Sequence, residues 1–194
     1  MRRKPSPNYL AAYPSDLQMQ VRRLIDEGQL GALLLKKYPL AHSVRTDKAL
    51  YDYVQDLKAE YLRNTGQLSL VAYDSNLQLI AQALGMHTRI ARVQGSKLKS
   101  KREIRVASLF RETPPEFLRM IVVHELAHLK EREHGKAFYQ LCRHMEPDYH
   151  QFEFDLRAYL CHLDARGEAL WSALTCATVD AENSARNHRE HGAH

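Results

Sequence analysis

The feature that most constrains this chain is a pair of histidines inside an almost wholly apolar run. His124 and His128 are four residues apart within the stretch FLRMIVVHELAHL, residues 117–129. Residues at that spacing lie one turn apart on the same face of an α-helix, so the two imidazoles can bind one metal ion. A helix that is apolar nearly all round is buried. Two imidazoles and a carboxylate in such a helix are costly unless paired or bound to a metal, which argues against a chance match on a solvated helix.

Glu125 lies about 100° round the same helix from His124. It does not join the histidine row at that position, but it can reach a water molecule held by the same metal. H-E-x-x-H is the arrangement found in zinc hydrolases, where the glutamate acts as the general base. The motif therefore predicts Zn²⁺ as the cofactor and Glu125 as a catalytic residue.

A third metal ligand is needed, because a catalytic zinc usually has three protein ligands and one open position for water. On a continuing helix Glu131 would lie close to the histidine row, and His134 would point away from it. Gly135 predicts that the helix ends near His134, however, and the turn could then fold His134 back to the metal. Packing of Phe138 and Leu141 would hold it there. We expect His134 in preference to Glu131; the weaker alternatives on the following segment are His144, Glu146 and His150.

The periodic patterns predict one α+β domain that begins with helices. Residues 1–9 are expected to be disordered, and residues 10–66 to form a helical N-terminal part. The helices expected there span residues 15–28, 30–38 and 47–64. After Gly66 the period changes to that of strands, which predicts a small sheet before the metal helix.

The second part of the domain is expected at residues 67–165. Its expected strands lie at residues 68–73, 89–93 and 104–110, with residues 77–84 left open between helix and strand. Thr113 and Glu116 predict a capping box at the start of the metal helix. The helices expected after it lie near residues 137–146 and 152–163. Residues 166–194 are expected to be a C-terminal extension, disordered from about residue 180.

The charge of the chain is concentrated in residues 89–105, which hold seven basic residues and one acid although the net charge of the whole chain is +5. One interpretation is a solvated hairpin. The other is a surface that attracts a phosphate, a nucleic acid or an acidic peptide. Under the second interpretation the candidate substrate-binding residues are Lys97, Lys99, Lys101 and Arg105.

The composition also bears on the compartment. The longest apolar run is far shorter than the ~20 residues needed to span a bilayer. The basic start MRRKPSPNY has no apolar segment behind it, as a secretory signal would need. Cys142, Cys161 and Cys176 are odd in number and share no C-x-x-C spacing, which predicts free thiols. We therefore expect a cytoplasmic protein with no membrane partner, and these features do not predict its oligomeric state.

The stretch VVHELAHLKEREHGKAFYQLCRHMEP resembles the YgjP-like metallopeptidase family, whose pattern is H-E-L-x-H followed by a third histidine in an H-G-x-x-F phrase. That phrase is His134-Gly-Lys-Ala-Phe138 in this chain. The similarity extends over most of residues 10–163. It implies a zincin-like fold of the small gluzincin type, zinc bound by His124, His128 and His134, and a catalytic role for Glu125. Close members are also described as pyrophosphatases of uridine triphosphate.

Three hypotheses about function follow. The motif favours a zinc-dependent metallopeptidase acting on a peptide, in which zinc lowers the pKa of its bound water towards about 7 and Glu125 takes the proton. The second hypothesis is hydrolysis of a nucleoside triphosphate such as UTP, which suits the basic segment better. The third is a zinc-stabilised module that binds protein or, less favoured, nucleic acid without catalysis. In either enzyme Tyr149 or His150 is a weaker candidate for a second electrophilic group.

Overall fold

The computed structural model describes residues 8–75 and 102–171. Its elements in chain order are α1 (Ser15–Asp26), α2 (Leu30–Lys37), α3 (Asp47–Tyr61), β1 (Leu70–Asp74), β2 (Glu103–Ala107), the 3₁₀ helix η1 (Ser108–Glu112), α5 (Pro115–Ala127), α6 (Lys136–Met145) and α7 (Tyr149–Arg166). The fold over these two ranges is therefore mostly helical α+β, as the sequence predicts. None of the helices in this part of the chain combines the length and the apolar character needed to cross a membrane.

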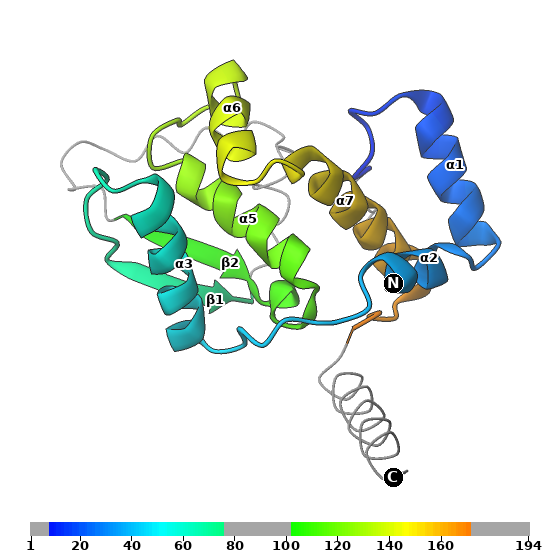
Figure 1. Cartoon of the computed structure of the whole chain (residues 1–194). Coiled ribbons are helices and arrows are strands. Elements are labelled where there is room, and N and C mark those ends of the chain that lie inside the picture. Colours follow the sequence, from blue (N-terminus) through cyan, green and yellow to red (C-terminus); the bar gives the residue numbers. More distant parts are fainter. Residues whose placement is uncertain (1–7, 76–101, 172–194) are drawn as a thin grey trace, which may run out of the picture.

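The helix α5 is the centre of the molecule. It packs against α7, α6, α3 and β2, and Figure 1 shows it lying between α3 and α7. Nine of its 13 residues are buried, including His124, so the helix is covered on nearly all sides. This burial confirms what the apolar run predicts.

A two-stranded parallel sheet lies beside α3 and α5. Leu70 of β1 pairs with Glu103 of β2, and the register continues to Asp74 beside Ala107. The inward side chains alternate along both strands, as expected where one face of a sheet is buried; they are Val71, Tyr73, Ile104 and Val106. α3 packs against β1, and α5 packs against β2. The sheet therefore supports the histidine helix.

The last described residue meets the end of α2 at the other end of α5. The indole Nε1 of Trp171 donates to the carbonyl of Tyr38 at 2.7 Å. The ring of Phe117 lies between these two residues, with centroid distances of 5.1 Å to Tyr38 and 5.6 Å to Trp171. Trp171 is fully buried, so the core extends past residue 165, where the sequence predicts the end of the second part.

Three expected boundaries differ in the structure. The strand expected at residues 104–110 ends at Ala107, because Ser108–Glu112 turns into a 3₁₀ helix. Thr113 does not cap α5; its hydroxyl donates to the carbonyl of Phe110, and α5 starts after Pro114. The helix expected to reach His134 ends at Ala127. The strand expected at 89–93, the ambiguous residues 77–84, most of the basic connection and the C-terminal tail lie outside the described residues.

Candidate metal centre

Three histidines meet just beyond the end of α5. His124 lies in the last turn of α5, His128 is its C-cap, and His134 belongs to the loop that leads to α6. The Nε2 atoms of His124 and His128 are 3.1 Å apart, and those of His128 and His134 are 3.0 Å apart. One ligand atom from each residue lies within 4.8 Å of the others. The structure thus brings together the three histidines predicted as metal ligands.

The chain leaves the helix early, which is how His134 reaches the other two. After Ala127 the amide of Leu129 donates a hydrogen bond to the carbonyl of Leu126, and the amide of Lys130 donates to the carbonyl of Ala127. These i to i−3 bonds tighten the last turn and end the helix. The remaining residues before α6 then fold back over the end of α5. The helix therefore ends seven residues before His134, and not beside Gly135 as the glycine predicts.

The arrangement fits a metal ion because the converging nitrogen of His128 carries a lone pair. The Nδ1 of His128 lies 2.9 Å from the backbone carbonyl of Glu131, which can only accept a hydrogen bond. The neutral ring is therefore protonated at Nδ1, and its Nε2 is unprotonated. Nitrogens bound to a tetrahedral zinc at about 2.0–2.1 Å would be roughly 3.4 Å apart, close to the separations seen here. Glu131, the alternative third ligand, contacts His128 through its backbone carbonyl and not through its carboxylate.

Burial keeps His124 neutral. Its side chain is buried, and desolvation, together with His128 and His134, lowers the pKa of His124 to about 2. A histidine must be neutral to bind a metal through its ring nitrogen. The buried side of the cluster thus favours the protonation state that a ligand needs.

The ring of Phe138 packs against all three histidine rings. Its ring centroid lies 4.9 Å from that of His124 and 4.7 Å from those of His128 and His134. It projects from the first turn of α6 and is completely buried. The sequence predicts this packing for Phe138 and for Leu141, which is partly buried.

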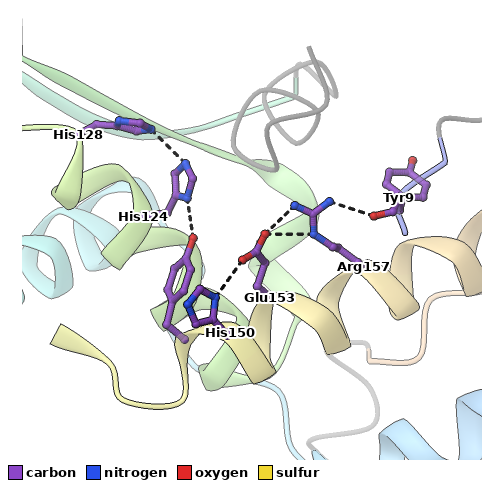
Figure 2. A network of polar contacts seen from close by, with 7 residues as sticks. Tyr9, His124, His128, His150, Glu153 and Arg157 are labelled. Carbon is purple, nitrogen blue, oxygen red and sulfur yellow. Dashed lines mark hydrogen bonds and ion pairs between the residues drawn. The ribbon is translucent and has the colours of Figure 1, made fainter. Parts of the chain in front are cut away.

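Tyr149 lies behind His124, and not on the side where Nε2 points. Its hydroxyl is 2.8 Å from Nδ1 of His124, and its side chain is 1% exposed. Burial raises the pKa of Tyr149 well above its usual range, so the phenol stays neutral. Figure 2 shows His124 and His128 joined by the contact between their Nε2 atoms. An electrophilic role for Tyr149 stays a prediction from sequence.

The rest of α7 carries a second polar network. His150 is exposed and lies 3.8 Å from Glu153, so it faces the neighbouring turn of α7 (Figure 2). The buried guanidinium of Arg157 pairs with Glu153 at 2.6 Å and donates to the carbonyl of Tyr9 at 2.9 Å. This pairing satisfies two buried charges and ties the N-terminal segment to α7.

The other predicted residues lie in different surroundings. Burial raises the pKa of Glu125, on α5, to about 7. His144 contacts the ring of Tyr61 edge-on, and Glu146 pairs with Arg119, so both are used elsewhere. Arg105 is paired with Asp74 and Glu103 on the sheet. Lys97, Lys99 and Lys101 lie outside the described residues.

Sequence reasoning missed the groups behind the ligands. Neither the Glu131 carbonyl nor the contact of Tyr149 with His124 follows from a motif, because a backbone group and a tyrosine 25 residues away along the chain carry no spacing signal. The ligands themselves stand at fixed spacings on one helix and its loop, which is why they could be found.

The family model of the YgjP-like metallopeptidase domain matches residues 32–159, which include all three histidines and Phe138. The chain belongs to this family. It is also similar to the UTP pyrophosphatase of Escherichia coli (strain K12), with 59% identity over 155 residues that cover 80% of this chain and 93% of that protein. No solved structure matches the chain at a significant level.

Proposed function

We propose that this YgjP-like protein is a zinc-dependent hydrolase that cleaves a nucleoside triphosphate, most readily UTP, and releases pyrophosphate. The observation that carries the proposal is the 59% identity to a UTP pyrophosphatase in a chain whose three histidines converge on one point. The sequence alone favours a peptidase, because H-E-x-x-H is read first as a peptidase motif. The comparison favours the second hypothesis instead.

His124, His128 and His134 would hold the zinc through their Nε2 atoms, since those atoms face one another. When bound, zinc would supply a Lewis acid that activates water and offsets the negative charge developing on the attacked phosphate. A structural zinc site has four protein ligands, whereas the group found among the described residues has three. An open position suits an enzyme better than a zinc-stabilised binding module.

Glu125 is the proposed general base. Its pKa of about 7, raised by burial, suits a group that must take up a proton and give it back at neutral pH. It would accept a proton from the attacking water. The water oxygen then bonds to the α-phosphorus, the bond to the oxygen that bridges the α and β phosphates breaks, and UMP and pyrophosphate leave.

The family description keeps a metallopeptidase as the second candidate. The contact of α5 with β2 supports a zincin-like arrangement, in which the H-E-x-x-H helix lies against a small sheet. An extended peptide could add to the edge of such a sheet. The same Glu125 and histidines would serve either substrate.

One experiment separates the two candidates. The zinc-loaded protein is incubated with UTP, with the other nucleoside triphosphates and with an unfolded protein, while pyrophosphate and cut peptides are measured in parallel. We expect UMP and pyrophosphate from UTP and no new peptides. The Glu125→Gln protein, prepared in the same way, controls for contaminating enzymes. Peptide cleavage that needs Glu125, without pyrophosphate release, would replace this proposal by the peptidase.

A further inference from the structure

The hydroxyl of Tyr149 makes the hydrogen bond at the back of His124. Tyr149 is the first residue of α7, and its ring lies nearly parallel to that of His124, at an angle of 17°. The contact is 2.8 Å long and ends on Nδ1, whereas Nε2 of the same ring faces His128. Because the two ring nitrogens are separate, Tyr149 can hold His124 without occupying its metal-binding atom.

The two anchored histidines differ in what holds them. The carbonyl of Glu131 can only accept, so it fixes the proton of His128 on Nδ1. A phenol can donate or accept, so Tyr149 alone allows either neutral form of His124. A metal needs the lone pair of Nε2, and this requires the proton on Nδ1, from which it is donated to the oxygen of Tyr149.

The phenol meets this requirement when its own proton is turned away from His124. Its oxygen is then free to accept the hydrogen bond from Nδ1. The contact joins the first residue of α7 to the last turn of α5, behind the ligand.

We infer that Tyr149 is a positioning residue for the metal: its hydroxyl accepts from Nδ1 of His124, holds that ring in the form protonated on Nδ1 and aims its Nε2 at the other two histidines. The inference rests on the metal site of the proposed function. It assigns Tyr149 a place behind a ligand, in contrast to the electrophilic role predicted from sequence. Loss of such a partner typically weakens metal binding about 10- to 100-fold.

The test compares Tyr149→Phe with Tyr139→Phe. Tyr139 is a second tyrosine of the same aromatic cluster, with its ring 6.3 Å from that of Tyr149, so its variant reproduces the loss of one hydroxyl. Zinc affinity is measured by competition with a chromophoric chelator, and the absorption spectrum of the cobalt-substituted proteins reports the ligand geometry. We expect Tyr149→Phe to bind zinc about 10- to 100-fold more weakly with a shifted cobalt spectrum, and Tyr139→Phe to match the wild type.

A second measurement needs no variant. In zinc-loaded wild type labelled with ¹⁵N-histidine, we expect the Nδ1 of His124 to carry the proton. A proton on its Nε2, or equal zinc affinities and cobalt spectra for Tyr149→Phe and wild type, would overturn the inference. Equal affinities and spectra leave the metal site standing, whereas a proton on Nε2 would show that His124 does not bind zinc through that atom. By contrast, if His124→Ala binds zinc as tightly as the wild type, the metal site on which the proposed function rests is wrong.

Discussion

His134 is the residue whose place depends most on the loop after α5. Replacing it by alanine removes one of three converging nitrogens, so we expect His134→Ala to lose most of its bound zinc. Glu131→Ala is the matched control, because Glu131 contributes a backbone carbonyl that alanine keeps. Metal content of both variants is measured after dialysis against a weak chelator. Full zinc in His134→Ala together with loss in Glu131→Ala would show that the third ligand is Glu131.

Glu125 is tested by a change that keeps its shape. Glutamine cannot accept a proton at neutral pH, so we expect Glu125→Gln to lower the turnover of UTP by at least about 10²-fold. Zinc content and melting temperature should stay near those of the wild type, because Glu125 does not belong to the histidine group. Turnover is followed by pyrophosphate release. An undiminished rate would remove Glu125 from the mechanism.

At the scale of single residues, the sequence predicts the cluster well and its supports poorly. The i, i+4 spacing of His124 and His128 is a geometric property of a helix, so the pair can be recognised from the order of the residues alone. The place of His134 depends on where the helix ends, and that end is set by hydrogen bonds between backbone groups near Leu126. A backbone turn of this kind has no side-chain signature, and the end expected from Gly135 is seven residues too late.

Among the elements, α6 affects the site through Phe138. We expect Phe138→Leu to weaken zinc binding, because a smaller, flexible side chain leaves the three imidazoles less firmly packed. Phe110→Leu is the control, since Phe110 is equally buried in η1 but belongs to another part of the core. Both variants should lose stability by a similar amount, about 1–2 kcal/mol, in chemical denaturation. Equal zinc affinities in the two would show that Phe138 contributes only to the core.

The connection between α2 and α3 is predicted to make folding pH-dependent. His42 accepts from the amide of Val44 at Nδ1 and donates from Nε2 to the carbonyl of Phe110, and the contact at Nδ1 requires the neutral ring. Burial, with a smaller contribution from Arg45, lowers the pKa of His42 below its usual value of 6.5. The unfolded chain therefore binds the proton more readily, and the stability that His42 contributes is complete above pH 6.5 and is lost as the pH falls below it.

Urea denaturation at about pH 7.5 and about pH 5.5, on either side of the usual histidine pKa, checks this expectation. The wild type should lose more stability between the two values than His42→Gln, which cannot titrate. Other buried histidines, among them His124, also gain a proton on unfolding in this range, so the comparison uses the difference between the two proteins. An identical loss in both would mean that His42 keeps the same pKa in the folded and unfolded chain.

The elements show where sequence patterns succeed. Helices with one apolar face, such as α3 with Leu50, Val54 and Leu57 buried, are expected within a few residues of their observed bounds. Ends are harder to predict. Thr113 has the right side chain for a cap, but its hydroxyl bonds to Phe110 in the preceding 3₁₀ helix, and that competition becomes visible only in three dimensions.

At the scale of the whole molecule, the question that the sequence leaves open is the substrate. The proposed mechanism would use a metal, a base and a water molecule, and these are common to peptide and phosphoanhydride hydrolysis. Charge is what distinguishes the two substrates, because a triphosphate brings several negative charges to the site. Arg105 is already paired with two acids on the sheet, so the lysines of the basic segment are the remaining candidates from the sequence.

We therefore expect the triple variant Lys97→Ala, Lys99→Ala and Lys101→Ala to raise the KM for UTP with a much smaller change in kcat, since removing charges that attract the substrate weakens its binding more than the chemical step. The control replaces Lys36, Lys48 and Lys58, which lie on α2 and α3, and so lowers the net charge of the chain by the same three units. Added salt should raise the KM of the wild type and of the control by screening, and affect the first variant less. If both triple variants have the KM of the wild type, the basic segment does not bind the triphosphate, and the cations that do must be sought elsewhere around the three histidines.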